Sequence, residues 1–193
     1  MKVSLRQIDG PWAAGHVLDK YLLRSVYLGD DAQGQPRFES TRSEVGEALF
    51  QLKYRRDPAQ AGPLAQALLT HVCPRLAPIG FLVPMPSDRA RPWQPMALVA
   101  RELSRRLGVP TFERLLMRSP LSRLPEGLAS REEKRDALSG AFFLQDEIRA
   151  QGRWNVLLID DVVDSGASLE AASVALAGYA KVHQVYVAAL TWQ

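Results

Sequence analysis

Two adjacent carboxylates and a run of small residues have the types and spacing of an anion-binding site. The segment 156–168 reads VLLIDDVVDSGAS, in which Asp160 and Asp161 follow four apolar residues. Gly166 permits a tight turn, so several loop amides can point at one ligand near the positive end of the helix that follows. In an open α/β sheet, ligands bind at the carboxyl ends of the strands. The pattern therefore predicts a phosphate site beside two acids.

Hydroxyl groups in the same loop can add to the site. Ser165 and Ser168 can donate to a phosphate, and Ser168 can also act as the N-cap of the helix. A magnesium-binding strand of a P-loop enzyme is excluded, because the chain contains no G-x-x-x-x-G-K-[ST] and no G-x-G-x-x-G motif. The alternative that LLIDD is merely the end of a buried strand stays open on the residues alone.

Hydrophobic periodicity predicts alternating strands and helices around this segment. Short apolar runs predict strands, whereas apolar residues spaced by three and four predict helices. A hairpin should begin near residues 21–28 with a turn in GDDAQGQPRF. The expected helices are 43–54, 64–73, 96–107 and 169–179, and the expected strands are 79–83, 140–144, 156–159 and 185–190. This order predicts an α/β fold with a mostly parallel, twisted sheet flanked by helices.

Composition limits the class of protein. The 193 residues carry a formal charge of only +3, which does not indicate nucleic-acid binding. The single cysteine, Cys73, cannot form an internal disulfide, and no run of eighteen apolar residues could span a bilayer. We therefore expect a cytoplasmic protein that does not contact membranes.

The segment VLLIDDVVDSGAS resembles the phosphoribosyl diphosphate (PRPP) signature of type I phosphoribosyltransferases. The resemblance implies that Asp160 and Asp161 are catalytic and bind the ribose hydroxyls, directly or beside Mg²⁺, the expected cofactor. It also implies a role for Asp164 at the N7 proton of a purine, for which an Asx-type contact that only shapes the loop is an equal alternative. The residues that would bind the 5′-phosphate are Asp164, Ser165, Gly166, Ala167 and Ser168.

Other segments resemble the ComF-like branch of that superfamily. They are LKY at Leu52–Tyr54, VPMP at Val83–Pro86, LVARELSRRLGVP at 98–110 and REEKRDALSGAF at 131–142. The cysteine-rich zinc module and the RGFNQ-like stretch of ComF proteins are both missing from this sequence. The resemblance implies a small N-terminal hood over the base site, at 1–55, and a phosphoribosyltransferase-like core at 56–193. It implies diphosphate binding by Met85, Pro86, Ser87, Asp88 and Arg89.

A basic stretch between residues 118 and 134 coincides with the place where the superfamily carries a flexible catalytic loop. Arg118, Arg123 and Arg131 could close over a bound diphosphate, although such runs are more commonly solvated surface. Lys53 could also reach the site. Trp93 and Trp192 are positioned in the sequence where an aromatic ring could stack on a base.

The resemblance implies a Mg²⁺-dependent phosphoribosyltransferase that binds PRPP and transfers the phosphoribosyl group to or from a nucleobase, with a purine as the candidate. A homodimer is a further expectation, with a nucleobase or nucleotide as the other ligand. Two alternatives remain. The same fold could sense PRPP or a nucleotide without turnover, or the chain could be associated with DNA uptake, as ComF proteins are.

Overall fold

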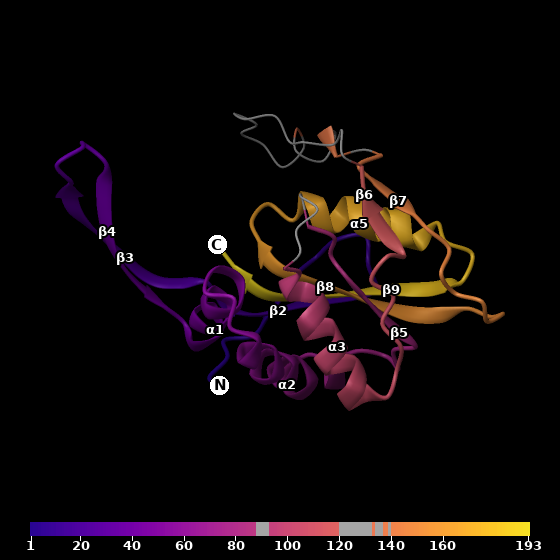
Figure 1. The fold of residues 1–193 in the computed structure, drawn as a ribbon. Helices are drawn as coiled ribbons and strands as arrows, with labels where there is room; N and C mark the ends of the chain where they lie inside the picture. Colours follow the sequence, from indigo (N-terminus) through magenta and orange to yellow (C-terminus); the bar gives the residue numbers. More distant parts are fainter. Residues whose placement is uncertain (88–92, 120–132, 134–136, 139) are drawn as a thin grey trace.

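A five-stranded sheet forms the centre of the molecule, and the computed structural model describes residues 1–87, 93–119, 133, 137–138 and 140–193 (Figure 1). Four strands run parallel, and β1 joins the edge antiparallel to β2. In spatial order the strands are β1 (Arg6–Gln7), β2 (Ala14–Lys20), β9 (Val182–Trp192), β8 (Trp154–Val163) and β5 (Phe81–Pro84). The prediction of a mostly parallel sheet is confirmed.

Strand β8 shows why the central strands have long apolar runs. Helices or other elements cover both faces of the sheet, so both sides of a central strand must be apolar. Leu157 and Ile159 pack into one core cluster, and Val156 and Leu158 pack into the other. Because successive side chains point to opposite faces, β8 connects the two cores.

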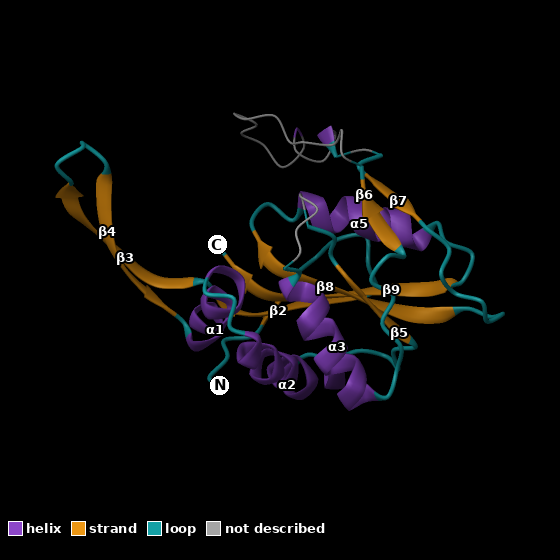
Figure 2. Cartoon of the chain, viewed as in Figure 1, coloured by secondary structure: helices purple, strands orange, loops and turns teal. Residues whose placement is uncertain are grey.

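Helices cover one face of the sheet, and a helix with a small hairpin covers the other (Figure 2). On the first face lie α1 (Glu44–Tyr54), α2 (Ala61–His71) and α3 (Pro95–Leu107), with short 3₁₀ turns at Pro58–Gln60 and Cys73–Arg75. The opposite face carries α5 (Ala167–Ala177), β6 (Leu116–Arg118) and β7 (Phe142–Leu144). Among the described residues, no helix combines the length and apolar character that crossing a membrane requires.

The start of α1 is tied to the carboxyl end of β2. The Ser43 hydroxyl accepts a hydrogen bond from the Gly46 amide at 2.9 Å and donates one to the Lys20 carbonyl oxygen at 2.5 Å. A side chain at Gly46 would collide with the backbone, because its Cβ would lie 2.3 Å from the carbonyl oxygen of Tyr21. This close contact holds α1 against the sheet edge and directs its last turn toward the end of β8.

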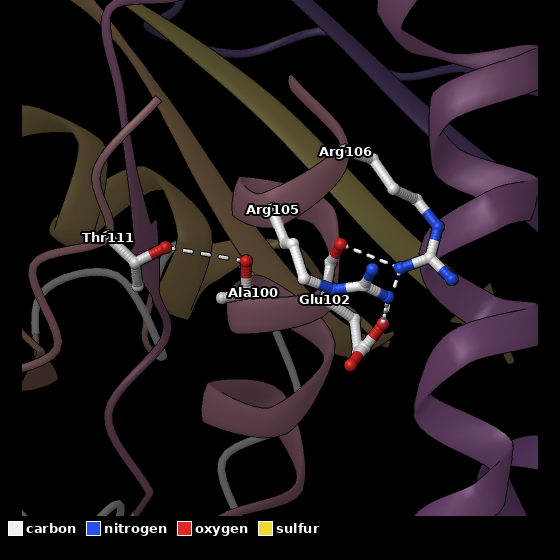
Figure 3. A network of polar contacts seen from close by, with 5 residues as sticks. All are labelled: Ala100, Glu102, Arg105, Arg106 and Thr111. Atoms are coloured by element: carbon white, nitrogen blue, oxygen red, sulfur yellow. Dashed lines mark hydrogen bonds and ion pairs between the residues drawn. The ribbon is translucent and has the colours of Figure 1, made fainter. Parts of the chain in front are cut away.

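The last turns of α3 form a polar network with its neighbours (Figure 3). The Glu102 carboxylate accepts hydrogen bonds from Arg105 and Arg106, and the Thr111 hydroxyl donates to the Ala100 carbonyl oxygen at 3.3 Å. Arg106 extends toward α2, where a Cβ on Gly62 would lie 3.5 Å from its Nη2 atom. The network lies at the end of α3 remote from its N-terminus and serves packing.

The N-terminal region contributes to the central sheet as well as to a projecting arm. The predicted hairpin is present as β3 (Leu22–Asp30) and β4 (Pro36–Arg42), and it extends away from the body of the molecule (Figure 1). Strand β2, which the sequence did not predict, pairs in parallel with β9 inside the main sheet. The division of the chain into a hood at 1–55 and a core at 56–193 stays a prediction, but the sheet itself includes residues from both segments.

Candidate functional site

The two acids lie inside β8, near its carboxyl end. Sequence analysis expected the strand to stop at Ile159, but β8 continues to Val163 because its pairing with β9 continues to that residue. Asp160 and Asp161 are therefore strand residues that point to opposite faces of the sheet. Asp160 shares the face of Leu158, toward α5, and Asp161 shares the face of Ile159, toward α1.

Asp160 is a buried carboxyl group with an unusual ionisation. Its exposed fraction is 8%, and its Oδ1 accepts a hydrogen bond from the Asp161 amide at 2.8 Å. Burial, followed by the negative charge of Asp161, raises the pKa of Asp160 to about 7, although the charges of Lys53 and Arg118 act in the opposite direction. The group is thus poised to gain or lose a proton near neutral pH.

Asp161 forms an ion pair with Lys53, the penultimate residue of α1. Burial opposes the charge of Lys53, but the ion pair and hydrogen bond to Asp161 outweigh it, and the pKa of Lys53 lies above its ordinary value. The Thr191 hydroxyl donates to the Asp161 carbonyl oxygen at 3.0 Å, which anchors the backbone of β8 to β9. The prediction that Lys53 can reach the acids is confirmed.

A double-mutant cycle measures how much the interaction between Lys53 and Asp161 contributes to the free energy of unfolding. Only 28% of the Lys53 side chain and 22% of the Asp161 side chain are exposed, so solvent screens the pair less than a surface pair. We expect Lys53→Met and Asp161→Asn each to lower the free energy of unfolding by about 1–2 kcal/mol, because each leaves a half-buried charge unpaired. The double variant should recover about 1 kcal/mol of the summed loss.

Urea denaturation of the four proteins measures this coupling. Lys53→Arg is the control, since it keeps the positive charge and should lose less stability than Lys53→Met. Strictly additive losses in the double variant would show that the pair contributes no interaction energy.

The loop after β8 begins helix α5 with a left-handed glycine. Gly166 is the N-cap, with φ 82° and ψ −7°, and the first intrahelical hydrogen bond runs from the Glu170 amide to its carbonyl oxygen at 3.0 Å. The prediction that Ser168 caps the helix is wrong, because the helix begins at Ala167 and Ser168 already lies in its first turn. The Ser165 hydroxyl accepts from the Ala167 amide at 3.5 Å, a long contact.

This loop forms one wall of an open cavity of about 240 Å³. The N-terminal segment that includes β1 and the end of β9 also line this cavity. The lining residues are Arg6, Gln7, Ile8, Asp9, Trp12, Val163, Asp164, Ser165, Gly166, Trp192 and Gln193. The cavity thus brings together three residues of the predicted phosphate loop and Trp192, one of the two predicted stacking aromatics.

Trp93, the other predicted stacking aromatic, belongs to the packing of the molecule. Its indole N–H donates to the Leu52 carbonyl oxygen at 2.8 Å, and its ring lies against the core beneath the helices. It therefore supports the last turn of α1, which carries Lys53, and does not line the cavity.

The predicted diphosphate segment follows β5 at the edge of the sheet. Met85 donates its amide to the Ile159 carbonyl oxygen at 2.8 Å, which places Met85, Pro86 and Ser87 beside the end of β8. Asp88 and Arg89 lie outside the described residues. Of the described residues of this segment, neither Met85 nor Pro86 nor Ser87 lines the cavity beside the phosphate loop.

Arg118 is the one member of the predicted flexible loop set that falls within the described residues; Arg123 and Arg131 fall outside them. It is the last residue of β6, and its guanidinium lies 5.6 Å from the centre of the Phe142 ring. Burial lowers the pKa of Arg118, and the charge of Asp160 partly counteracts this. Arg118 therefore presents a positive charge to Asp160 from the face opposite Lys53.

A magnesium ion could be held here only with help from its substrate. Among the described residues, no group of three or more His, Cys, Asp or Glu side chains is arranged to hold a metal. Magnesium typically uses one or two carboxylates together with water and substrate phosphates, so the pair Asp160 and Asp161 is chemically suitable. Both acids are at the end of β8 nearest the phosphate loop.

Comparison with solved structures finds this fold in adenine phosphoribosyltransferases. The enzyme from Trypanosoma brucei, in complex with AMP, pyrophosphate and ribose-5-phosphate, is 14% identical, with 100% of this chain and 76% of that chain covered and a TM-score of 0.51. The Saccharomyces cerevisiae enzyme, complexed with adenine and an imino-altritol bisphosphate, is 18% identical over 87% and 85% of the chains, with a TM-score of 0.44. No protein-family model and no curated protein matches the sequence.

The chain therefore has the fold of type I phosphoribosyltransferases. This agrees with the parallel sheet and its two covered faces. The assignment to the ComF-like branch stays a prediction, as do the roles of the individual site residues.

Proposed function

We propose that this protein is a Mg²⁺-dependent phosphoribosyltransferase that uses PRPP and a purine base. The observation that carries the proposal is the loop 164–168, where a left-handed glycine starts α5 beside a cavity, directly after a strand that bears two acids. The fold supports the same class of reaction, because solved adenine phosphoribosyltransferases share it.

The charges at the end of β8 suit the chemistry of phosphoribosyl transfer. Loss of diphosphate from the anomeric carbon develops positive charge on the ribose, and nearby carboxylates stabilise such a charge. Asp160 and Asp161 would hold the ribose hydroxyls, and the amides at the start of α5 would hold the 5′-phosphate. A bound magnesium would supply charge neutralisation for the diphosphate, held by one of these acids together with oxygens of the substrate.

Lys53 and Arg118 fit this role as counter-ions of Asp160 and Asp161 before the substrate binds. Each presents positive charge to the acid pair from a different face of the sheet. Without such neighbours, two adjacent carboxylates would repel each other. The substrate must compete with Lys53 for Asp161, which favours a ligand that brings its own cation.

Asp164 is proposed to act at the base. It is exposed, it lines the cavity, and it is the first residue of the phosphate loop. A carboxylate in this place could accept or return the proton on N7 of a purine bound beside it. The adenine and AMP complexes of the fold neighbours make adenine the first base to test.

The test is an assay with PRPP, Mg²⁺ and a panel of bases that begins with adenine, hypoxanthine and guanine. We expect a mononucleotide and diphosphate to appear in equal amounts with one purine, and Asp164→Asn to reduce the rate with that base. PRPP that binds and raises the melting temperature without any product would support the sensor alternative. No binding of PRPP at all would refute the proposal.

A further inference from the structure

Among the described residues that line the cavity, one has a positive side chain, and it comes from the N-terminal segment. Among the described residues that line it, the ionisable ones are Arg6, Asp9 and Asp164. The segment 163–168, VDSGAS, carries a carboxylate and no basic group. A positive side chain that contacts a phosphate bound on this loop must therefore come from another segment of the cavity lining.

Within the part of the chain that the structure describes, the guanidinium of Arg6 has no hydrogen-bond or ion-pair partner, so it can provide a positive charge inside the cavity. Its guanidinium lies over the Trp192 ring, 6.0 Å from the ring centre, and among the described residues no hydrogen bond or ion pair involves it. A guanidinium that stacks on an aromatic face keeps its in-plane N–H donors available. These donors have the fork geometry that binds phosphate oxygens in pairs.

The wall that carries Arg6 is held firmly in place. Arg6 pairs with Val17 in the β1–β2 ladder, and the Ile8 amide donates to the Gly15 carbonyl oxygen at 2.9 Å. The Trp12 indole donates to the Ile8 carbonyl oxygen at 3.0 Å, and its ring lies so close to Gly15 that a Cβ there would be 2.4 Å from Nε1. The backbone beneath Arg6 is thus fixed relative to the sheet.

We propose that Arg6, whose guanidinium lies over the Trp192 ring, binds the 5′-phosphate of the substrate together with the loop 164–168 in this cavity. This inference rests on the proposed function and adds a residue that lies more than 150 positions away in the sequence. Asp9 also lines the cavity, but Arg6 lies over the Trp192 ring and forms no ion pair with Asp9. The guanidinium is therefore available for an anion.

The test compares the binding of ribose 5-phosphate, ribose and adenine by calorimetry. We expect Arg6→Gln to weaken ribose 5-phosphate binding about tenfold, since a charge-assisted contact to phosphate is lost. Arg6→Lys should recover part of the affinity, because it keeps the charge and loses the planar fork. Trp192→Leu keeps the Arg6 cation but removes the aromatic ring beneath it, so it should also weaken the binding of ribose 5-phosphate.

Arg24→Gln is the matched control, because Arg24 is an exposed arginine on β3, outside the cavity. It should leave all three ligands unaffected, and circular dichroism checks that each variant is folded. If Arg6→Gln binds ribose 5-phosphate as the unmodified protein does, the inference is overturned and the proposed function stands. If Arg6→Gln weakens the binding of adenine and not that of ribose 5-phosphate, Arg6 contacts the base, and its proposed role at the phosphate is also overturned. If the unmodified protein binds neither ribose 5-phosphate nor PRPP, the proposed function itself fails.

Discussion

Asp160→Asn should make the protein more stable at pH 8 while it abolishes transfer. The unfolded chain ionises this carboxyl near pH 3.8, whereas the folded protein holds its proton up to a pKa of about 7. Between these values the native state binds more protons, so the free energy of unfolding falls as the pH rises from 4 to 7 and then levels off. An asparagine of the same shape has no charge to bury, and it should be more stable at pH 8 by on the order of 1–3 kcal/mol.

Activity should change in the opposite direction. If Asp160 holds the ribose and stabilises its developing charge, the asparagine variant should lose at least about 100-fold in kcat/KM for PRPP. Urea denaturation at pH 5 and pH 8, with the transfer assay, measures both effects. Asp161→Asn is the comparison: it should also lose activity, but it should destabilise the protein because Lys53 loses its partner. An Asp160→Asn protein that is less stable at pH 8, or fully active, would contradict the assignment.

Gly166→Ala should remove most of the affinity for ribose 5-phosphate. The residue has φ 82°, in the left-handed region that a side chain makes costly, and it immediately precedes the first helical amides. To relieve the strain, the loop must rotate these amides away from a shared ligand. We expect binding to weaken by about 30-fold or more, from the loss of two or more amide contacts at about 1 kcal/mol each.

Gly108→Ala separates this effect from simple strain. Gly108 has φ 70° as the C-cap of α3, and a Cβ there would meet nothing within 4 Å. Both alanine variants should lose about 1 kcal/mol of stability from the left-handed backbone. Only Gly166→Ala should lose affinity in calorimetry. Equal affinities for the two variants would show that the loop amides do not hold the phosphate.

Contiguous parts of the site could be predicted from the sequence. Residues 156–168 combine a buried strand, two acids and a glycine turn within thirteen positions, so local patterns were sufficient. The start of α5 was predicted two residues late, because Ser168 has the chemistry of a cap but Gly166 has the conformation of one. The extent of β8 was also underestimated, since pairing with β9 outweighs the poor strand preference of two aspartates.

Contributions from distant segments could not be predicted in the same way. Strand β2 reads AGHVLDK, and its buried polar residues His16 and Asp19 disrupt the apolar pattern that signals a strand. β1 is only two residues long, so no periodicity marks it, and nothing in its sequence connects Arg6 with Trp192. Lys53 could be named as a residue that reaches the site, but its partner depends on how α1 packs against the end of β8, which no local pattern specifies.

The order of strands also bears on how the chain folds during synthesis. β9 lies between β2 and β8, so β2 has no parallel neighbour until the ribosome has made residues 182–192. Until then, two sheet edges with apolar side chains stay open, and such edges favour association between nascent chains. We therefore expect the yield of native protein to fall when synthesis pauses between residues 154 and 181, because the open edges then persist for longer.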